Sequence, residues 1–308
     1  MSTVEFKDRV AIITGAGGGL GKSHAIELAK RGVKVVVNDL GGSVDGSGGS
    51  GTMAEQVVAE IVAAGGEAIA NGANVTKEDE VAAMVGEAIE RWGHVDILVN
   101  NAGILRDKSF SKMSMDDFRL VLDVHLMGSA ICTKAVWDHM KERQYGRIVM
   151  TTSSSGNYGN FGQSNYGAAK AGLVGLMNTL CLEGAKYDIR VNALSPTAAT
   201  RMTEGLMPQP ALDLLTVESV TAGLVPLVCE DAPNRLILCA GAGGYAATKV
   251  YETQGVHLTP DQQTAENVLA QIKAIRDGEG QEEYTSGAGQ TMKFESRAAK
   301  ALGLNLGM

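Results

Sequence analysis

A short apolar run that leads straight into a glycine-rich loop is the feature of this sequence that most restricts its fold. Residues 10–13, Val-Ala-Ile-Ile, contain no polar residue, which is typical of a strand buried on both faces of a parallel sheet. The loop Thr14–Gly21 follows directly, and helical periodicity then continues to Gly32. In this context the loop predicts a pyrophosphate site at a helix N-terminus, with a structural turn as the alternative. The expected cofactor contacts in this loop are Gly15, Gly19, Leu20 and Gly21.

Strand-like and helical stretches then alternate, at roughly 30 residues per unit, as far as residue 245. Further strands are expected at 33–37, 67–70, 95–99, 146–153, 189–194 and 236–239, and helices at 53–64, 77–92, 115–140 and 164–187. The alternation predicts an α/β fold with a Rossmann-type, doubly wound parallel sheet in a single core domain, residues 1–250. Residues 251–308 are more polar and predict a partly helical C-terminal extension, with helices near 259–276 and 294–302.

Composition excludes several classes of function. The 308 residues are 44% hydrophobic and 20% charged, as in a soluble globular protein, and the net charge of −8 argues against nucleic-acid binding. The four cysteines are scattered without metal-ligand spacing, so a reduced compartment and no metal site are expected. No signal peptide or membrane-length apolar run is evident. We therefore expect a cytoplasmic protein without a membrane partner.

An acidic residue after the second strand bears on the choice of dinucleotide. Asp39 lies 24 residues after Gly15, where its carboxylate can accept hydrogen bonds from the adenosine ribose and would repel the 2′-phosphate of NADP. NAD is the expected cofactor, and a helix-capping aspartate is the alternative. The Gly/Ser insertion at 41–51 is expected to be flexible and to lie near the adenosine end. Asn74 and Val75, at the next strand end, are expected to flank the adenine.

A second motif joins a strand end to a helix at residues 146–170. Tyr166 and Lys170 are four residues apart and share a helix face, and Ser153 comes from the end of the preceding strand. A phenol next to an ammonium group, with a hydroxyl nearby, can form an acid/base site. A solvated helix face is the alternative.

These motifs together resemble the short-chain dehydrogenase/reductase family over roughly residues 5 to 245. The matching features are Thr14-Gly-x-x-x-Gly19-x-Gly21, Asn100-Asn101-Ala102-Gly103, Ser153, and Tyr166-x-x-x-Lys170, with Ser153 preceding Tyr166 by 13 positions. The resemblance implies that Tyr166, Lys170 and Ser153 are catalytic. It also implies that Tyr166 and Lys170, together with Asn100, Ala102, Gly103 and Pro196, contact the cofactor. A small-molecule substrate and a homodimer or homotetramer are implied as well.

Within that family, the chain shows a closer resemblance to the (3R)-hydroxyacyl-CoA dehydrogenase part of the peroxisomal multifunctional enzyme type 2 and to similar bacterial stand-alone enzymes. The shared stretches include residues 35–42, 100–110 and 158–163. This similarity implies NAD-dependent oxidation of a (3R)-3-hydroxyacyl-CoA, including steroid side-chain thioesters. The alternatives are a 17β-type hydroxysteroid dehydrogenase, a 3-oxoacyl carrier-protein reductase and an NAD-sensing binding module.

Two positions depart from the family pattern: His125, and Thr197, which follows Pro196 where the family commonly has glycine. The substrate contacts are the least specific of the expectations. His125 stands where the family usually has an asparagine of the proton relay, so it is either catalytic or structural. Candidate substrate contacts are Arg106, Lys108, Tyr158, Arg201 and Met202. The two arginines and the lysine could bind CoA phosphates, and a solvated charged loop is the alternative. The methionine-rich segment 201–215 is expected to form a substrate lid.

Overall fold

A computed structural model describes residues 4–43, 45, 46, 48, 52–199 and 208–306. The chain divides into two compact units, Met1–Thr248 and Lys249–Met308. All of the motifs described above lie in the first unit.

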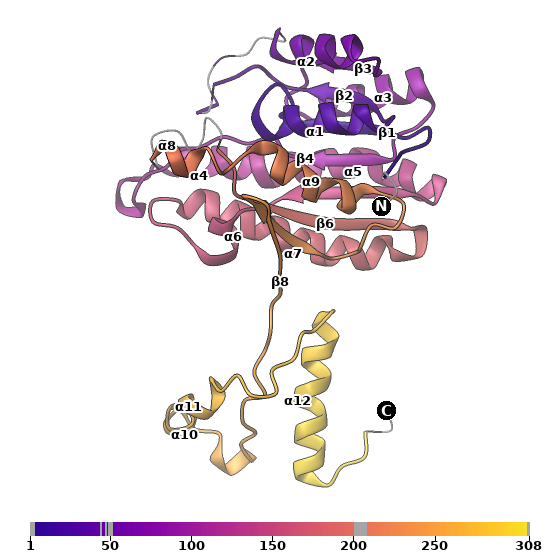
Figure 1. Cartoon of the computed structure of the whole chain (residues 1–308). Helices are drawn as coiled ribbons and strands as arrows, with labels where there is room; N and C mark the ends of the chain where they lie inside the picture. The colour runs from indigo at the N-terminus through magenta and orange to yellow at the C-terminus, as the bar shows by residue number, and fades with distance from the viewer. Residues whose placement is uncertain (1–3, 44, 47, 49–51, 200–207, 307–308) are drawn as a thin grey trace. The chain divides into compact units, whose positions relative to one another are not determined.

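The first unit is built on a single eight-stranded sheet (Figure 1). Its strands are β1 (Val10–Thr14), β2 (Lys34–Asn38), β3 (Ala68–Asn71), β4 (Ile97–Asn100), β5 (Gly146–Thr151), β6 (Ile189–Pro196), β7 (Ile237–Gly241) and β8 (Gly244–Thr248). Their order across the sheet is β3-β2-β1-β4-β5-β6-β7-β8. The pairs from β3 to β7 are parallel, and the doubly wound α/β fold is confirmed.

The sequence predicted a last strand at 236–239, whereas the structure adds β8, which pairs antiparallel with β7. Four of the five residues of β8 are exposed. An exposed edge strand carries no buried apolar run, so the pattern that revealed the central strands does not reveal this one.

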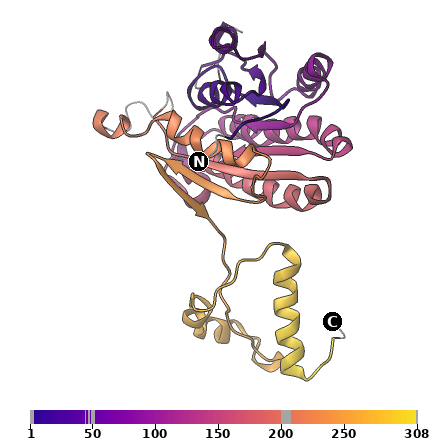
Figure 2. The same ribbon diagram turned by 45° about the vertical axis from the view of Figure 1, so that its right-hand side comes forward.

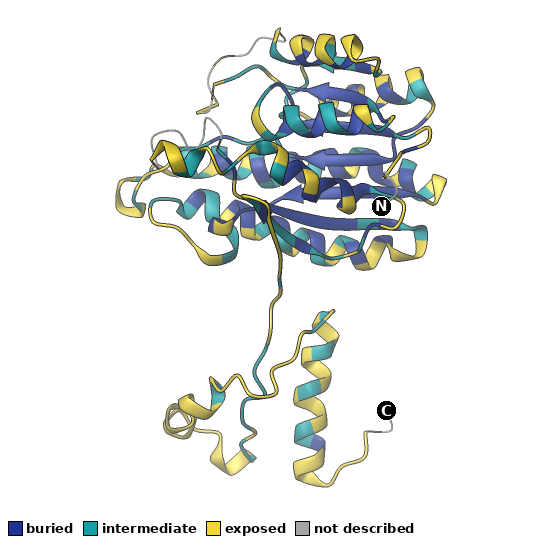
Figure 3. Ribbon diagram, in the orientation of Figure 1, coloured by how far each residue is buried: buried dark blue, intermediate teal, exposed yellow. Residues whose placement is uncertain are grey.

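Helices cover both faces of the sheet (Figures 1 and 2). They are α1 (Gly19–Lys30), α2 (Thr52–Ala63), α3 (Glu78–Trp92), α4 (Met115–Leu122), α5 (Gly128–Arg143), α6 (Ser154–Tyr158), α7 (Ser164–Gly184), α8 (Gln209–Leu212) and α9 (Val217–Val228), with the short turns η1 (Phe110–Lys112), η2 (Asp123–Met127) and η3 (Ala185–Tyr187). Successive residues of β1 face opposite layers: Ile13 packs with residues of α1, α2 and α9, and Ile12 with residues of α3, α5 and α7. The strands between the layers are therefore buried on both sides, as Figure 3 shows.

The sequence predicted one helix over 115–140, but the structure changes its winding in the middle. Between α4 and α5, η2 is a π-type turn that contains His125. Such a turn inserts one extra residue per helical turn and is frequent at functional sites. Hydrophobic periodicity does not detect a single inserted residue, so this feature was not expected.

Two stretches, Met115–Arg143 and Gln209–Val228, are long and apolar enough to cross a membrane by length and composition alone. The expectation that no run reaches this length was therefore wrong. Within these stretches α5 and α9 pack against opposite faces of the sheet. Packing of this kind accounts for their apolar residues.

The second unit contains η4 (Pro260–Gln262), α10 (Ala265–Ala270), α11 (Ile272–Ile275) and α12 (Gly287–Leu302). The single helix predicted near 259–276 is therefore broken into short turns, and the helix predicted from 294 begins at Gly287. Polar contacts rather than a large core join its segments. Lys293 pairs with Glu252 at 2.7 Å, and Ala299 is the one buried residue among those described in this unit.

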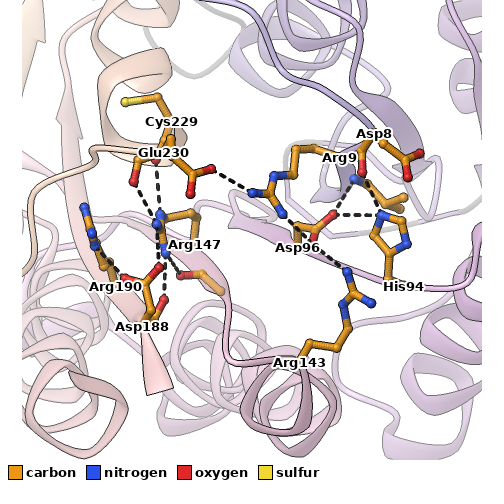
Figure 4. Close-up of polar contacts among 12 residues, drawn as sticks. Asp8, Arg9, His94, Asp96, Arg143, Arg147, Asp188, Arg190, Cys229 and Glu230 are labelled. Atoms are coloured by element: carbon orange, nitrogen blue, oxygen red, sulfur yellow. Dashed lines mark hydrogen bonds and ion pairs between the residues drawn. The ribbon is translucent and has the colours of Figure 1, made fainter. Parts of the chain in front are cut away.

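A buried ion network joins the amino ends of the central strands (Figure 4). The Asp96 carboxylate has no exposed surface; it accepts a hydrogen bond from the Val10 amide at 3.0 Å and pairs with Arg9 at 3.3 Å and with His94 at 3.1 Å. The fully buried Arg147 guanidinium pairs with Asp188 at 3.0 Å and donates to the Glu230 carbonyl at 2.8 Å. This edge of the sheet is thus fixed by charge pairs between segments distant in sequence.

We expect the free energy of unfolding of the Asp96→Ala variant to be lower by about 3 kcal/mol, because the Val10 amide loses its acceptor and Arg9 and His94 lose a buried carboxylate partner, keeping Glu230 and the Asp8 carbonyl. Urea unfolding measures the change. The matched control is Asp116→Ala, which removes a carboxylate whose side chain is 95% exposed and paired with Arg119. That control should change the stability by less than about 1 kcal/mol. If both variants lost the same free energy of unfolding, the buried network would not stabilise the fold more than a surface ion pair does.

Candidate active site

A cleft of about 310 Å³ opens at the carboxyl ends of the central strands. Most of the residues expected to bind a cofactor line it, together with His125. They are Gly15, Gly19, Leu20, Gly21, Asp39, Asn74, Val75, Ala102, Gly103, Tyr166, Lys170 and Pro196. The carboxyl edge of a parallel sheet is where ligands bind in open α/β folds.

The glycine loop is held against the end of β4 by two polar side chains. The Thr14 hydroxyl accepts hydrogen bonds from the amides of Asn101 at 3.0 Å and Ala102 at 3.1 Å. The Asn101 amide group in turn donates to the carbonyls of Thr14 at 2.9 Å and Gly15 at 3.0 Å. A Cβ at Gly21 would lie 2.2 Å from the Gly15 carbonyl oxygen, so this approach requires glycine.

The residues of this loop fit a dinucleotide. Gly18 caps α1 without a side-chain hydrogen bond, and the first turn of the helix carries no acidic residue. The helix N-terminus therefore remains available to an anionic pyrophosphate. Beside it, the Asp39 carboxylate accepts from the Gly17 amide at 2.8 Å and the Gly41 amide at 2.7 Å, one bond to each oxygen. Each oxygen has a second acceptor position for a ribose hydroxyl.

The glycine-rich insertion reaches further along the cleft than the adenosine end where it was expected. Arg106 Nε donates to the Asp45 carbonyl at 2.7 Å, and a Cβ at Gly46 would lie 3.2 Å from the Ile104 side chain. The described part of the insertion thus extends from Asp39 to the loop after β4.

Ser153, Tyr166 and Lys170 come together at the end of β5. Ser153 caps α6, and its hydroxyl accepts from the Ser155 amide at 3.2 Å. Burial raises the pKa of Tyr166, while a hydrogen bond with Ser153 lowers it and the negative charge of Asp107 raises it. Lys170 Nζ donates to the Thr151 carbonyl at 2.5 Å and lies 5.5 Å from the centre of the Tyr166 ring. Burial lowers the pKa of Lys170 to about 7.

His125 lies against both the loop after β4 and the Tyr166 ring. Its Nε2 is 3.1 Å from the Ile104 nitrogen and 2.8 Å from the Ile104 oxygen, so it accepts from one group or donates to the other according to its tautomer. The imidazole meets the Tyr166 ring edge-on at 5.1 Å between ring centroids. Burial and the Lys170 charge hold the pKa of His125 well below its usual range, so the ring is neutral. A Cβ at Gly103 would lie 2.2 Å from this imidazole, which explains the glycine.

The candidate substrate contacts do not converge in the same way. Arg106 and Lys108 both pair with Asp117, at 3.0 and 3.4 Å. Tyr158 is 72% exposed, and its hydroxyl lies 3.0 Å from that of Thr248. Residues 201 and 202, where Arg201 and Met202 were singled out, lie outside the described residues, as does most of the first half of the expected lid.

Asn100 was expected to contact the cofactor through its backbone or its amide group, and its side chain faces the core. It is 3% exposed and donates to the Thr133 hydroxyl at 3.0 Å. Side chains alternate along a strand, so the neighbouring Asn101 reaches the cleft instead. The motif identified the pair of asparagines but not which of them faces the cleft.

A set of polar contacts behind Tyr166 was also missed. Gln163 Nε2 donates to Asp107 at 2.7 Å, and Gln163 Oε1 accepts from the Ser155 hydroxyl at 2.7 Å. The buried Asn165 donates to the Arg106 carbonyl at 3.1 Å. The signal in the sequence was the run of amide side chains just before Tyr166, where a helix start needs partners for its backbone groups.

Comparison with known proteins identifies the class. The family model described as short chain dehydrogenase matches residues 9–211, and the chain belongs to this family of enzymes. A short-chain type dehydrogenase/reductase of Mycobacterium tuberculosis is 48% identical over 276 residues, covering 89% of this chain and 96% of that protein. The family generally uses NAD or NADP, acts on small molecules and is commonly oligomeric.

The relatives include peroxisomal multifunctional enzymes. The type 2 enzyme of Drosophila melanogaster is 49% identical over 255 residues, covering 82% of this chain but only 42% of that protein. Its full-length structure matches with a TM-score of 0.81 at 36% identity, over 96% of this chain and 50% of that chain. A 7α-hydroxysteroid dehydrogenase complexed with NADH and 7-oxo glycochenodeoxycholic acid matches with a TM-score of 0.70 at 29% identity, over 78% of this chain and 95% of that chain.

Because His125 is neutral in the folded protein, the free energy of unfolding should decrease as the pH falls. Because its pKa is lower in the folded state, the unfolded chain binds the extra proton as the pH falls below about 6.5, and stability decreases. We expect His125→Asn to reduce this loss by about 1.4 kcal/mol per pH unit, since an amide can still meet the Ile104 backbone. Urea unfolding at a series of acidic pH values measures the slope. An unchanged slope would show that His125 takes up a proton without cost in the fold.

Proposed function

We propose that this short-chain dehydrogenase oxidises a secondary alcohol to a ketone with NAD, and that its substrate is a (3R)-3-hydroxyacyl-CoA. The observation that carries the proposal is that Tyr166 and Lys170 line the same cleft as the glycine loop and Asp39, with Ser153 hydrogen-bonded to Tyr166. The similarity to the multifunctional enzymes supports an acyl thioester substrate. On this proposal the enzyme works in lipid or steroid breakdown as a cytoplasmic homo-oligomer.

In this mechanism each residue has a distinct task. Tyr166 takes the proton of the substrate hydroxyl at its phenolic oxygen, and returns it when the reaction runs toward the alcohol. The charge of Lys170, one helical turn away, stabilises the phenolate. The Ser153 hydroxyl, whose oxygen already accepts from the Ser155 amide, donates a hydrogen bond to the substrate oxygen and stabilises the negative charge that develops there. The nicotinamide of bound NAD would supply the hydride acceptor.

In this mechanism His125 positions the groups around it and does not transfer a proton. Its neutral ring contacts the Ile104 backbone on one side and the edge of Tyr166 on the other. It therefore fixes the loop after β4 next to the catalytic phenol.

The hydroxysteroid alternative has its own support, because the solved 7α-hydroxysteroid dehydrogenase shares the fold at 29% identity. An NADPH-dependent reductase is disfavoured by Asp39, which would face the 2′-phosphate. A binding module without turnover would have no need of the serine, tyrosine and lysine together.

A substrate screen tests the proposed function. Purified protein with NAD should form NADH with 3-hydroxyacyl-CoAs of graded chain length, and the R epimers should react while the S epimers do not. The Tyr166→Phe variant should lose turnover by at least about a thousandfold while it still binds NAD, because only the proton acceptor is removed. Turnover with free hydroxysteroids alone would move the assignment to a hydroxysteroid dehydrogenase. Unchanged turnover in Tyr166→Phe would contradict the mechanism.

Cofactor choice should depend on Asp39. Wild-type protein should prefer NAD, and Asp39→Ala should reduce the ratio of kcat/KM for NAD over NADP by at least about tenfold, because repulsion of the 2′-phosphate disappears. Asp39→Asn is the matched control for fold, since its amide oxygen still accepts one backbone hydrogen bond. A wild-type preference for NADP would overturn the cofactor assignment.

A further inference from the structure

A polar chain connects the loop after β4 to the catalytic serine. The Asp107 carboxylate accepts from Gln163 Nε2 at 2.7 Å, and Gln163 Oε1 accepts from the Ser155 hydroxyl at 2.7 Å. The Ser155 amide then donates to the Ser153 hydroxyl oxygen at 3.2 Å. Four residues from two separate segments are thus joined by consecutive hydrogen bonds, the last of them through the Ser155 backbone amide.

The position of Gln163 brings this chain next to the phenol. Gln163 is the residue before α7, and Tyr166 follows it by three residues, so both lie on the same side of the first helical turn. Asn160 also donates to Gln163 Oε1, at 3.1 Å, which fixes the orientation of the amide. The Gln163 nitrogen is therefore turned toward Asp107.

The loop that carries Asp107 is held on both sides of this residue. The Arg106 carbonyl accepts from the buried Asn165 at 3.1 Å, and the Lys108 amide donates to the Gly162 carbonyl at 2.9 Å. With both neighbours bound to the segment that starts α7, Asp107 has little freedom to move away from Tyr166.

The charge of Asp107 is not neutralised by its basic neighbours. Arg106 and Lys108 both pair with Asp117, at 3.0 and 3.4 Å. Among the described residues, Asp107 has no ion-pair partner of its own. Its negative charge consequently acts on the surrounding groups, weakened by the solvent to which it is exposed.

Other polar groups of the described residues also face Tyr166. Lys170 lies on the same helix, His125 presents its neutral ring from η2, and Ser153 presents a hydroxyl from the end of β5. Lys170 favours the phenolate, whereas Asp107 opposes it. Asp107 and Lys170 therefore act in opposite directions on the same proton.

We propose that Asp107 is a positioning residue, anchored by Gln163, whose charge sets the pH range in which Tyr166 loses its proton. This inference rests on the proposed role of Tyr166 as the base, but not on the identity of the alcohol. The charge of Asp107 keeps the phenol protonated to a higher pH than Lys170 alone would allow. The direction agrees with the rise that Asp107 causes in the pKa of Tyr166.

The test is the Asp107→Asn variant, which keeps the acceptor for Gln163 and removes the charge. In alcohol oxidation, the acidic limb of the pH profile of kcat/KM should move to lower pH by about half a unit, because Tyr166 loses its proton more readily. In ketone reduction the alkaline limb should move in the same direction. Both shifts should shrink at high salt, because exposed charges are screened.

Asp116→Asn is the matched control, since Asp116 is a solvated carboxylate near the same loop and pairs with Arg119. It should leave both limbs in place. Gln163→Ala should shift the limbs in the same direction as Asp107→Asn, and should add no further shift when the two are combined. If the pH profiles of kcat/KM for Asp107→Asn superimpose on those of the wild type, the proposal is overturned.

A second measurement does not depend on turnover. The ultraviolet absorbance change of phenolate formation, taken as the difference between each protein and its Tyr166→Phe counterpart with NAD bound, reports the ionisation of Tyr166 directly. Asp107→Asn should lower the midpoint of this titration. If the protein oxidises an alcohol other than a 3-hydroxyacyl-CoA and the midpoint moves, the proposed substrate fails and this inference stands. If turnover is normal and the midpoint does not move, only this inference fails.

Discussion

The parallel pairing of β1 with β4 is the constraint on which the cleft depends. It brings the end of each strand to the same edge of the sheet, so that the Thr14 hydroxyl can accept from the amides of Asn101 and Ala102. The glycine loop is thereby fixed in the position from which it faces the cleft. Because β5 pairs with the other side of β4, the segment carrying Ser153 also arrives at this edge. The strand order alone therefore collects loops that lie far apart in sequence.

Buried charged side chains have different kinds of partner at the two edges of the sheet. At the amino edge, Asp96 and Arg147 have no exposed surface and each has ion-pair partners. At the carboxyl edge, Lys170 is buried with the Thr151 carbonyl as its acceptor, and its pKa falls to about 7. A buried ammonium group without a counterion stabilises any negative charge that forms beside it. The Tyr166 phenolate would be such a charge, so the protonation of these two residues is coupled.

The sequence predicted the features that depend on local pattern. The buried central strands, the glycine loop and the Tyr166/Lys170 helix face follow from apolar runs, glycine spacing and helical periodicity. What it did not predict depends on tertiary contacts or on one-residue shifts. The π-type turn at His125 leaves the apolar periodicity nearly unchanged, β8 is exposed, and the choice between Asn100 and Asn101 depends on which face of the strand looks into the cleft.

The rim of the cleft shows most clearly why residue type is a poor guide to substrate contacts. Arg106 and Lys108 had suggested a site for CoA phosphates, but Asp117 binds both of them, and Arg106 also holds the Asp45 carbonyl. A phosphate could use these cations only by displacing a carboxylate already in contact, which cancels most of the gain in electrostatic energy. Together, Asp107 and Asp117 carry as many negative charges as Arg106 and Lys108 carry positive ones. Affinity for an acyl thioester would then come chiefly from apolar contacts with its acyl chain, and selectivity from the geometry of the hydroxyl against Ser153 and Tyr166.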